Sequence, residues 1–100
     1  MVRFAVSLRS SVAAARIARG FSQQTLARMA GVSRQTIVEI EGGDYNPSTA
    51  LALRLSLLLG MHVEGLFQLP ESEIRELLAR RDQHATKETR SGPARQEDEP

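Results

Sequence analysis

Apolar and small residues recur at three- and four-residue intervals through most of the first 69 positions, the spacing of one face of an amphipathic helix. The runs are short and are separated by glycines and serines, residue types that end and begin helices. They predict five helices, over residues 8–19, 23–29, 34–41, 49–59 and 63–67. Short helices joined by tight turns pack as one compact bundle, so the pattern predicts an all-α fold.

The chain beyond the fifth helix differs in character. Three aliphatic residues there follow helical spacing, which predicts a further C-terminal helix over residues 70–85. Farther on, no aliphatic side chain is larger than alanine, so we expect residues 86–100 to be a disordered tail. Residues 1–69 then form the folded domain. The three aliphatic residues are Ile74, Leu77 and Leu78.

The first residues of the chain leave two interpretations open. Val2, Phe4 and Val6 alternate with other residues as in a β-strand, so they could form an N-terminal β-arm. The triplet is too short to establish a strand, and we favour a simple lead-in to the first helix.

The charge is distributed unevenly, although the whole chain carries a net charge of only +1. Residues 1–69 contain seven arginines against four acidic side chains, a net charge of +3. Residues 70–100 contain six basic and eight acidic side chains, a net charge of −2. An acidic C-terminal segment therefore masks a mildly basic body, which is compatible with a polyanionic partner.

Composition disfavours several classes of protein. The absence of cysteine excludes a disulfide scaffold and thiol-based zinc sites. No stretch approaches the ~18 apolar residues of a membrane span, and residues 1–7 lack the features of a signal peptide. We expect a cytoplasmic protein with no membrane partner. His62 and His84 lack a metal-ligand spacing, and no nucleophile or phosphate-loop motif occurs, so we expect no metal, no cofactor and no enzymatic activity.

Residues 21–41 carry the most specific pattern in the chain. Ala27 is small where a second helix would pack against it, and Gly31 permits a sharp turn through positive φ. Ile37 and Ile40 anchor the second helix to the core. Two short helices joined in this way, with polar side chains left facing outward, have the geometry of a helix that reads a DNA groove.

This pattern resembles a known family. From Ser22 to Glu41 it runs Ser-Gln-x-x-Leu-Ala-x-x-x-Gly-Val-Ser-x-x-x-Ile-x-x-x-Glu, which is similar to the helix-turn-helix of the Cro/XRE family of phage-repressor-like regulators. The resemblance extends over residues 8–67 and includes Tyr45-Asn46-Pro47-Ser48. It implies a lambda-repressor-like domain that binds double-stranded DNA. It also implies a dimeric transcriptional regulator, most simply a repressor, on a pseudo-palindromic operator.

The outward-facing side chains are the candidate DNA contacts. Arg34 and Gln35 fall in the first turn of the recognition helix, where arginine suits the edge of guanine and glutamine that of adenine. Gln23 begins a helix, a position that the family uses to clamp a phosphate. For Glu39 an acceptor role toward cytosine and a merely solvent-facing charge are equally plausible. The full candidate set is Gln23, Gln24, Ser33, Arg34, Gln35, Thr36, Glu39, Gly43, Tyr45 and Asn46.

Two further features concern the frame around the recognition helix. The resemblance implies a salt bridge between Arg16 and Glu41. We assign this pair to fixing how the helices pack against one another, and not to contact with DNA. The loop that follows carries Asp44 where the family often has a basic residue, which should weaken phosphate binding. Gly42 and Gly43 are expected to leave backbone N–H groups accessible there.

Helix 49–59 carries more leucines than one buried stripe can use. Its predicted inner stripe is Ala52, Leu55, Ser56 and Leu59, which leaves Leu51, Leu53, Leu57 and Leu58 over the flanks and the outer face. So many exposed leucines need a cover. We favour the same surface of a second chain, and the alternative is the chain's own tail over a monomer. The expected dimer contacts are Leu53, Leu57, Ile74, Leu77 and Leu78.

Two other functions remain open at this point. The chain could be an antitoxin that binds a toxin through its C-terminal aliphatic residues and represses its own operon. It could also be the DNA-binding part of a larger ligand-sensing regulator, because residues 47–70 resemble the corresponding part of such fused domains.

Overall fold

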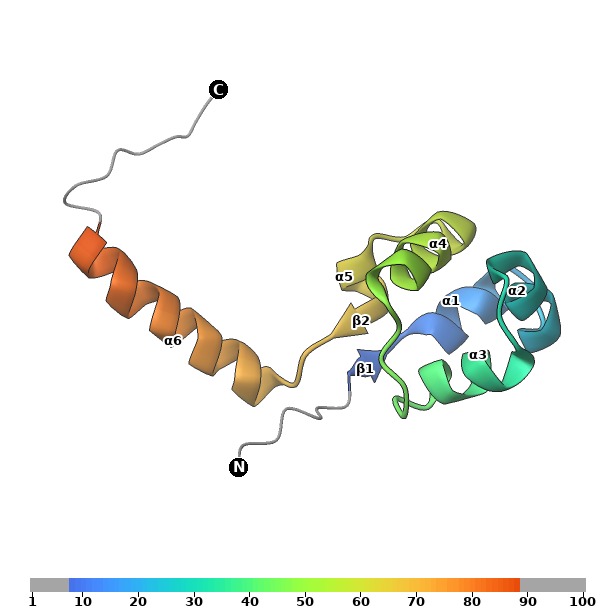
Figure 1. The fold of residues 1–100 in the computed structure, drawn as a ribbon, viewed down its shortest axis with the longest axis horizontal. Helices are drawn as coiled ribbons and strands as arrows, with labels where there is room; N and C mark the ends of the chain where they lie inside the picture. The colour runs from blue at the N-terminus through green and yellow to red at the C-terminus, as the bar shows by residue number, and fades with distance from the viewer. Residues whose placement is uncertain (1–7, 89–100) are drawn as a thin grey trace, which may run out of the picture. The chain divides into compact units, whose positions relative to one another are not determined.

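The computed structural model describes residues 8–88, and the chain divides into two compact units, Met1–Pro70 and Glu71–Pro100 (Figure 1). The first unit holds α1 (Val12–Ala18), α2 (Gln23–Ala30), α3 (Arg34–Glu41), α4 (Thr49–Leu59), α5 (Val63–Leu66), β1 (Arg9–Ser10) and β2 (Phe67–Gln68). The second unit holds α6 (Glu71–Glu88). The predicted all-α fold with a helix-turn-helix is confirmed, and the described part of the chain adds only one two-stranded sheet.

Serine caps begin three of the helices, as the sequence predicts. Each serine hydroxyl accepts a hydrogen bond from the backbone N–H three residues later, at 3.0 to 3.1 Å. At the other end of α4, Gly60 adopts a φ of +68°, and a side chain there would collide with the guanidinium of Arg19. That guanidinium donates from Nε to the carbonyl of Leu59 at 3.2 Å and so closes α4. The capping serines are Ser22, Ser33 and Ser48.

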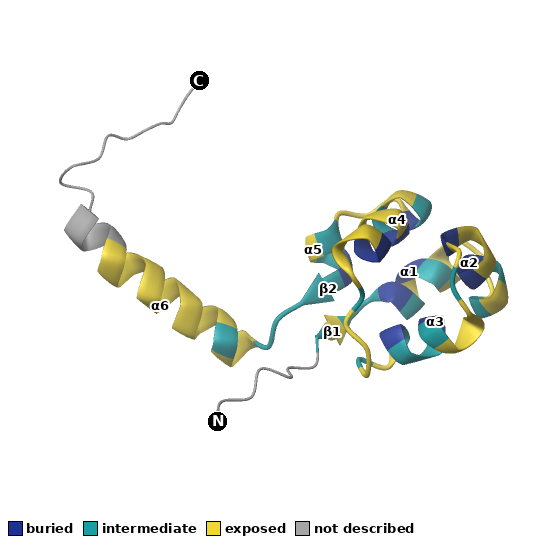
Figure 2. Cartoon of the chain, in the orientation of Figure 1, coloured by how far each residue is buried: buried dark blue, intermediate teal, exposed yellow. Residues whose placement is uncertain are grey.

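One apolar core holds the first unit together (Figure 2). All five of its helices contribute to this core, and α2 and α3 pack closely against each other. Burial of such side chains supplies the main favourable free energy of folding. The largest fully buried side chains are Val12, Leu26, Ile37, Ile40, Leu55 and Leu66.

The first helix begins later than predicted. Residues 8–11 precede it, and Arg9 and Ser10 form β1, which pairs antiparallel with β2 so that Ser10 lies opposite Phe67. The N–H of Ser11 donates to the carbonyl of Leu66 at 2.8 Å. Because these backbone groups are paired with the far end of the domain, they are not available to a helix. The suggested β-arm at Val2, Phe4 and Val6 lies outside the described residues.

The buried face of α4 also differs from the prediction. Leu51 is buried with Ala52, Leu55 and Leu59, whereas Ser56 is only partly buried and donates its hydroxyl to the carbonyl of Met61. A small rotation of the helix exchanges a serine for a leucine in the core, and a leucine gains far more from burial. The outer face keeps Leu53 and Leu57.

The second unit is described by α6 alone, an 18-residue helix that extends three residues past Ala85, where the predicted helix ended. Ion pairs four residues apart support it on its surface: Arg75 with Glu71 at 3.6 Å and Arg80 with Glu76 at 2.8 Å. The side chains of Ile74, Leu77 and Leu78 are 37–44% exposed. Residues 89–100, which include most of the predicted tail, lie outside the described residues.

Candidate nucleic-acid interface

The turn between α2 and α3 sets the direction of the recognition helix. Gly31 ends α2 in the left-handed region with a φ of +79°. The N–H of Val32 then donates back to the carbonyl of Ala27 at 3.0 Å. Ala27, Ile37 and Ile40 are at most 1% exposed, so the inner face of α3 is committed to the core. The polar face of α3 consequently points to solvent.

The outer face of α3 gathers the predicted base-reading side chains. Arg34 and Gln35 are exposed in its first turn, directly after the capping Ser33. Ser33 and Thr36 share a hydroxyl hydrogen bond of 2.9 Å. Gln35 donates from Nε2 to Oε2 of Glu39 at 3.2 Å, so these two side chains lie along one edge of the helix. The Gln35 amide is therefore held beside the Glu39 carboxylate.

Arg16 and Glu41 meet across the fold, as the resemblance implies. Arg16 donates from Nε to Oε2 of Glu41 at 2.6 Å and from Nη2 to Oε1 at 3.3 Å. A third bond runs from Nη1 to the carbonyl of Phe21 at 2.9 Å. The two side chains are only 13% and 8% exposed. The pair is bidentate and mostly shielded from water, which makes its geometry specific.

Arg16→Ala should lower the free energy of unfolding by about 2–3 kcal/mol, somewhat below the ~3–5 kcal/mol of a fully buried pair because water still reaches the arginine. The matched control is Arg28→Ala, an exposed arginine on α2 that should change stability by no more than ~0.5 kcal/mol. Urea denaturation followed by circular dichroism measures both. Equal midpoints for the two variants would show that the bridge does not stabilise the fold.

The start of α2 departs from the simple phosphate clamp. Gln24 is exposed, but Gln23 is half-buried and both ends of its amide are already engaged. Its Nε2 donates to Oε1 of Glu41 at 3.0 Å, and its Oε1 accepts from Nη2 of Arg34 at 3.1 Å. Sequence reasoning listed these residues separately and missed the connection between them. Only the fold brings together three positions so far apart in the chain.

The loop after α3 is also more occupied than predicted. The N–H groups of Gly42, Gly43 and Asp44 donate to carbonyls of α3 at 2.9 to 3.2 Å, because they close the end of that helix. The expected accessible N–H groups are therefore already paired. Tyr45 and Asn46 are exposed beyond them.

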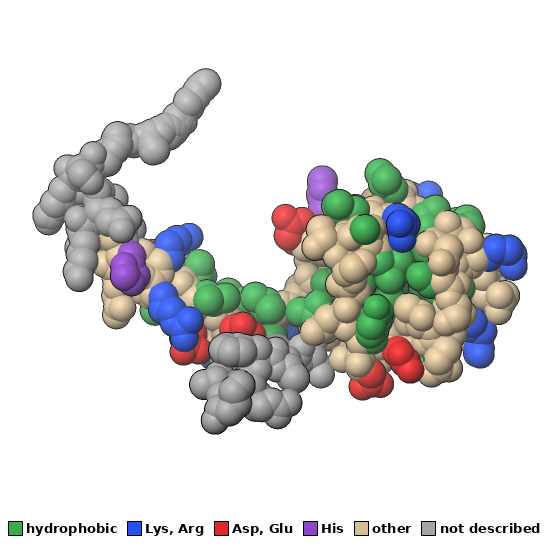
Figure 3. Space-filling view, viewed as in Figure 1, with side chains coloured by type: hydrophobic (Ala, Val, Ile, Leu, Met, Phe, Trp, Pro, Cys, Tyr) green, Lys and Arg blue, Asp and Glu red, His purple; other side chains and the backbone are tan. Residues whose placement is uncertain are grey.

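The candidate dimer contacts fall into two sets. On α4, Leu53 and Leu57 are 53% and 85% exposed, and hydrophobic side chains gather on the face of the unit where α4 lies (Figure 3). On α6, the three aliphatic residues named above lie in the other unit. Each set is a separate candidate surface.

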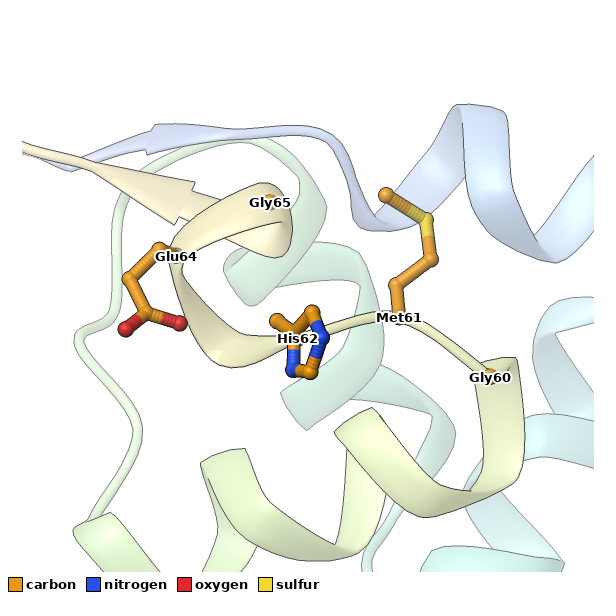
Figure 4. Close-up of a pocket in the computed structure, with 5 residues that line it drawn as sticks. All are labelled: Gly60, Met61, His62, Glu64 and Gly65. Atoms are coloured by element: carbon orange, nitrogen blue, oxygen red, sulfur yellow. The ribbon is translucent and has the colours of Figure 1, made fainter.

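A depression of about 810 Å³ at the turn between α4 and α5 is lined by Gly60, Met61, His62, Glu64 and Gly65 (Figure 4). It offers one histidine and one carboxylate. Within residues 8–88, no three histidine, cysteine or acidic side chains lie close enough to hold a metal ion. The same residues contain no helix with the length and apolar character needed to cross a membrane.

The bundle and its exposed third helix define a helix-turn-helix protein. A family model described as Helix-turn-helix matches residues 12–66, which span α1 to α5. The chain belongs to this family, in the Cro/XRE type that its motif resembles, and it is a DNA-binding transcriptional regulator.

Known proteins support this assignment. The chain is 46% identical over 52 residues to the Bacillus subtilis protein named "Uncharacterized HTH-type transcriptional regulator YgzD", with 52% of this chain and 79% of that one covered. It is 40% identical over 58 residues to an HTH-type transcriptional regulator of Methanocaldococcus jannaschii, covering 58% and 88%. Among solved structures, the restriction-modification controller protein C.AhdI from Aeromonas hydrophila is similar with a TM-score of 0.50, 32% identity, and 53% and 80% covered. Proteins named as regulators of this type are not an enzyme class.

Proposed function

We propose that the protein binds double-stranded DNA sequence-specifically by inserting α3 into the major groove, and that it represses transcription as a dimer. The observation that carries the proposal is the outer face of α3, where Arg34 and Gln35 are exposed in the first turn over a fully buried inner face. A helix held in this way presents its N-terminal residues to base edges.

The residue types suggest what each contact reads. Arg34 suits O6 and N7 of guanine, and Gln35, aligned by Glu39, suits N6 and N7 of adenine. Gln24, Tyr45 and Asn46 are exposed members of the candidate set, and we propose that they contact the DNA backbone. The +3 charge of residues 1–69 favours approach to phosphates.

The proposed dimer has two-fold symmetry. One recognition helix contacts few base pairs, and a symmetric pair would read two half-sites of a pseudo-palindrome about 10 bp apart. The exposed leucines of α4 provide a surface for that pairing. A small dimer seated on an operator blocks other proteins from the same DNA, which makes repression the simplest outcome. The restriction-modification controller protein among its structural neighbours is compatible with such a control function.

The exposed aliphatic stripe of α6 favours a second candidate function, the binding of another protein. Ile74, Leu77 and Leu78 form a stripe on one side of a charged helix. A stripe of this kind can bind a second protein, as an antitoxin binds its toxin. This role would add to DNA binding and would not replace it.

Arg34→Ala and Gln35→Ala should each weaken binding to the preferred operator by about 1–3 kcal/mol and relax the preference at one base pair. The operator is first selected from random duplex DNA with the full-length chain, and dissociation constants are then measured for each variant. Arg75→Ala, which removes an exposed arginine from α6, is the control and should leave the base preference unchanged. Unchanged affinity and selectivity for Arg34→Ala would show that α3 is not the reading helix.

A further inference from the structure

A continuous chain of hydrogen bonds connects a shielded ion pair to the first residue of the recognition helix. Arg16 on α1 donates to Glu41 at the end of α3, and Glu41 accepts from Gln23 at the start of α2. Gln23 in turn accepts from Arg34. From Glu41 outward the exposure of the side chains rises, since Glu41 is 8% exposed, Gln23 is half-buried and Arg34 is exposed. The shielded ion pair is therefore connected to a surface arginine through one amide.

The chemistry of the two neighbours permits only one orientation of that amide. A carboxylate can only accept and a guanidinium can only donate, so Gln23 must turn its NH₂ toward Glu41 and its oxygen toward Arg34. Glutamate at position 23 would place a second carboxylate against Glu41, and leucine would make neither bond. Glu41 thus determines where the oxygen that holds Arg34 lies.

We propose that Glu41 is a positioning residue for base recognition: it orients Gln23, and Gln23 holds the guanidinium of Arg34 ready for a guanine edge. The proposal rests on the proposed function, because it requires that Arg34 meets a base. Only one of the five guanidinium N–H groups is needed for Gln23, which leaves enough donors for a bidentate contact with O6 and N7.

Advance positioning matters because arginine has a long side chain with many rotamers. Ordering such a side chain on binding costs conformational entropy, and a side chain already held in place loses less. The Arg16–Glu41 pair consequently contributes to sequence preference in addition to its part in the fold. Removing the ion pair should therefore weaken the preference for one base, in addition to any loss of folding stability.

The test compares full-length variants on the operator selected above. The base pair of interest is the one whose preference Arg34→Ala relaxes, and the readout is the ratio of dissociation constants for the preferred and the replaced base there. Glu41→Gln should lower that ratio by about three- to tenfold, the effect of one hydrogen bond. Gln23→Leu should lower it similarly, and it leaves the Arg16–Glu41 pair intact, so its folding is not at risk. Glu64→Gln, which removes an exposed carboxylate on α5, is the control and should leave the ratio unchanged.

The double variants separate the positioning function from a structural one. In an Arg34→Ala background, Glu41→Gln and Gln23→Leu should have no further effect on this ratio. The proposal is overturned if both substitutions weaken binding to all sequences evenly and leave the ratio unchanged. In that case Arg34 would still read its base, but without positioning by Glu41. If Arg34→Ala relaxes no base pair at all, the proposed reading function itself is wrong and the positioning role is overturned with it.

Discussion

Replacing Ile37 or Leu55 by alanine should lower the free energy of unfolding by about 2–5 kcal/mol, the range for large-to-small substitutions in a packed core. Both side chains are fully buried, Ile37 on the inner face of the recognition helix and Leu55 in the centre of α4. A domain of this size is stable by only about 5–15 kcal/mol, so the loss is a large fraction of the total. The melting temperature should fall by about 4–8 °C for each kcal/mol lost.

The control is on the same helix as one of the two substitutions. Leu57→Ala removes the same atoms as Leu55→Ala, but Leu57 is 85% exposed, so in the monomer it should change stability by no more than ~0.5 kcal/mol. Thermal and urea denaturation at low protein concentration measure all three variants. A similar loss for Leu55→Ala and Leu57→Ala would mean that α4 does not pack on the face described.

Much of the fold could be predicted because its signals are local. The serine caps, the positive φ at Gly31 and the helical spacing of Ile37 and Ile40 each depend on residues within one or two turns of helix. The same local reasoning identified Arg34 as an exposed residue of the recognition helix. Features with a local physical cause can be inferred from the order of residues alone.

The features that sequence reasoning missed depend on contacts distant in the chain. β1 has only two residues and pairs with residues 67–68, so no alternating pattern marks it. The choice of Leu51 over Ser56 in the core depends on how α4 rotates against its neighbours. The connection of Glu41 to Arg34 through Gln23 exists only once three helices have packed. No pattern within a single helix contains this information.

Placing charge on the outer face of α4 should separate the proposed dimer into monomers. Leu53 and Leu57 are four residues apart, so their side chains share one face of the helix, and the exposed Ala50, three residues before Leu53, extends that face. An exposed apolar stripe of this kind marks an interaction surface. Sedimentation of the unaltered chain at tens of micromolar is expected to give the mass of a dimer.

The double variant Leu53→Glu and Leu57→Glu should sediment as a monomer. Burying four carboxylates at a symmetric interface is far more unfavourable than the apolar contact is favourable. Affinity for the full operator should fall by about 10²–10⁴-fold, because two linked recognition helices then act singly. Affinity for an isolated half-site should be unchanged, which shows that α3 itself is intact.

The matched double variant Ile74→Glu and Leu77→Glu tests α6 in the same way. If only the α6 variant becomes monomeric, the dimer contact is on α6 and the leucines of α4 have another partner. A monomeric mass for the unaltered chain would instead rule out self-association through either helix.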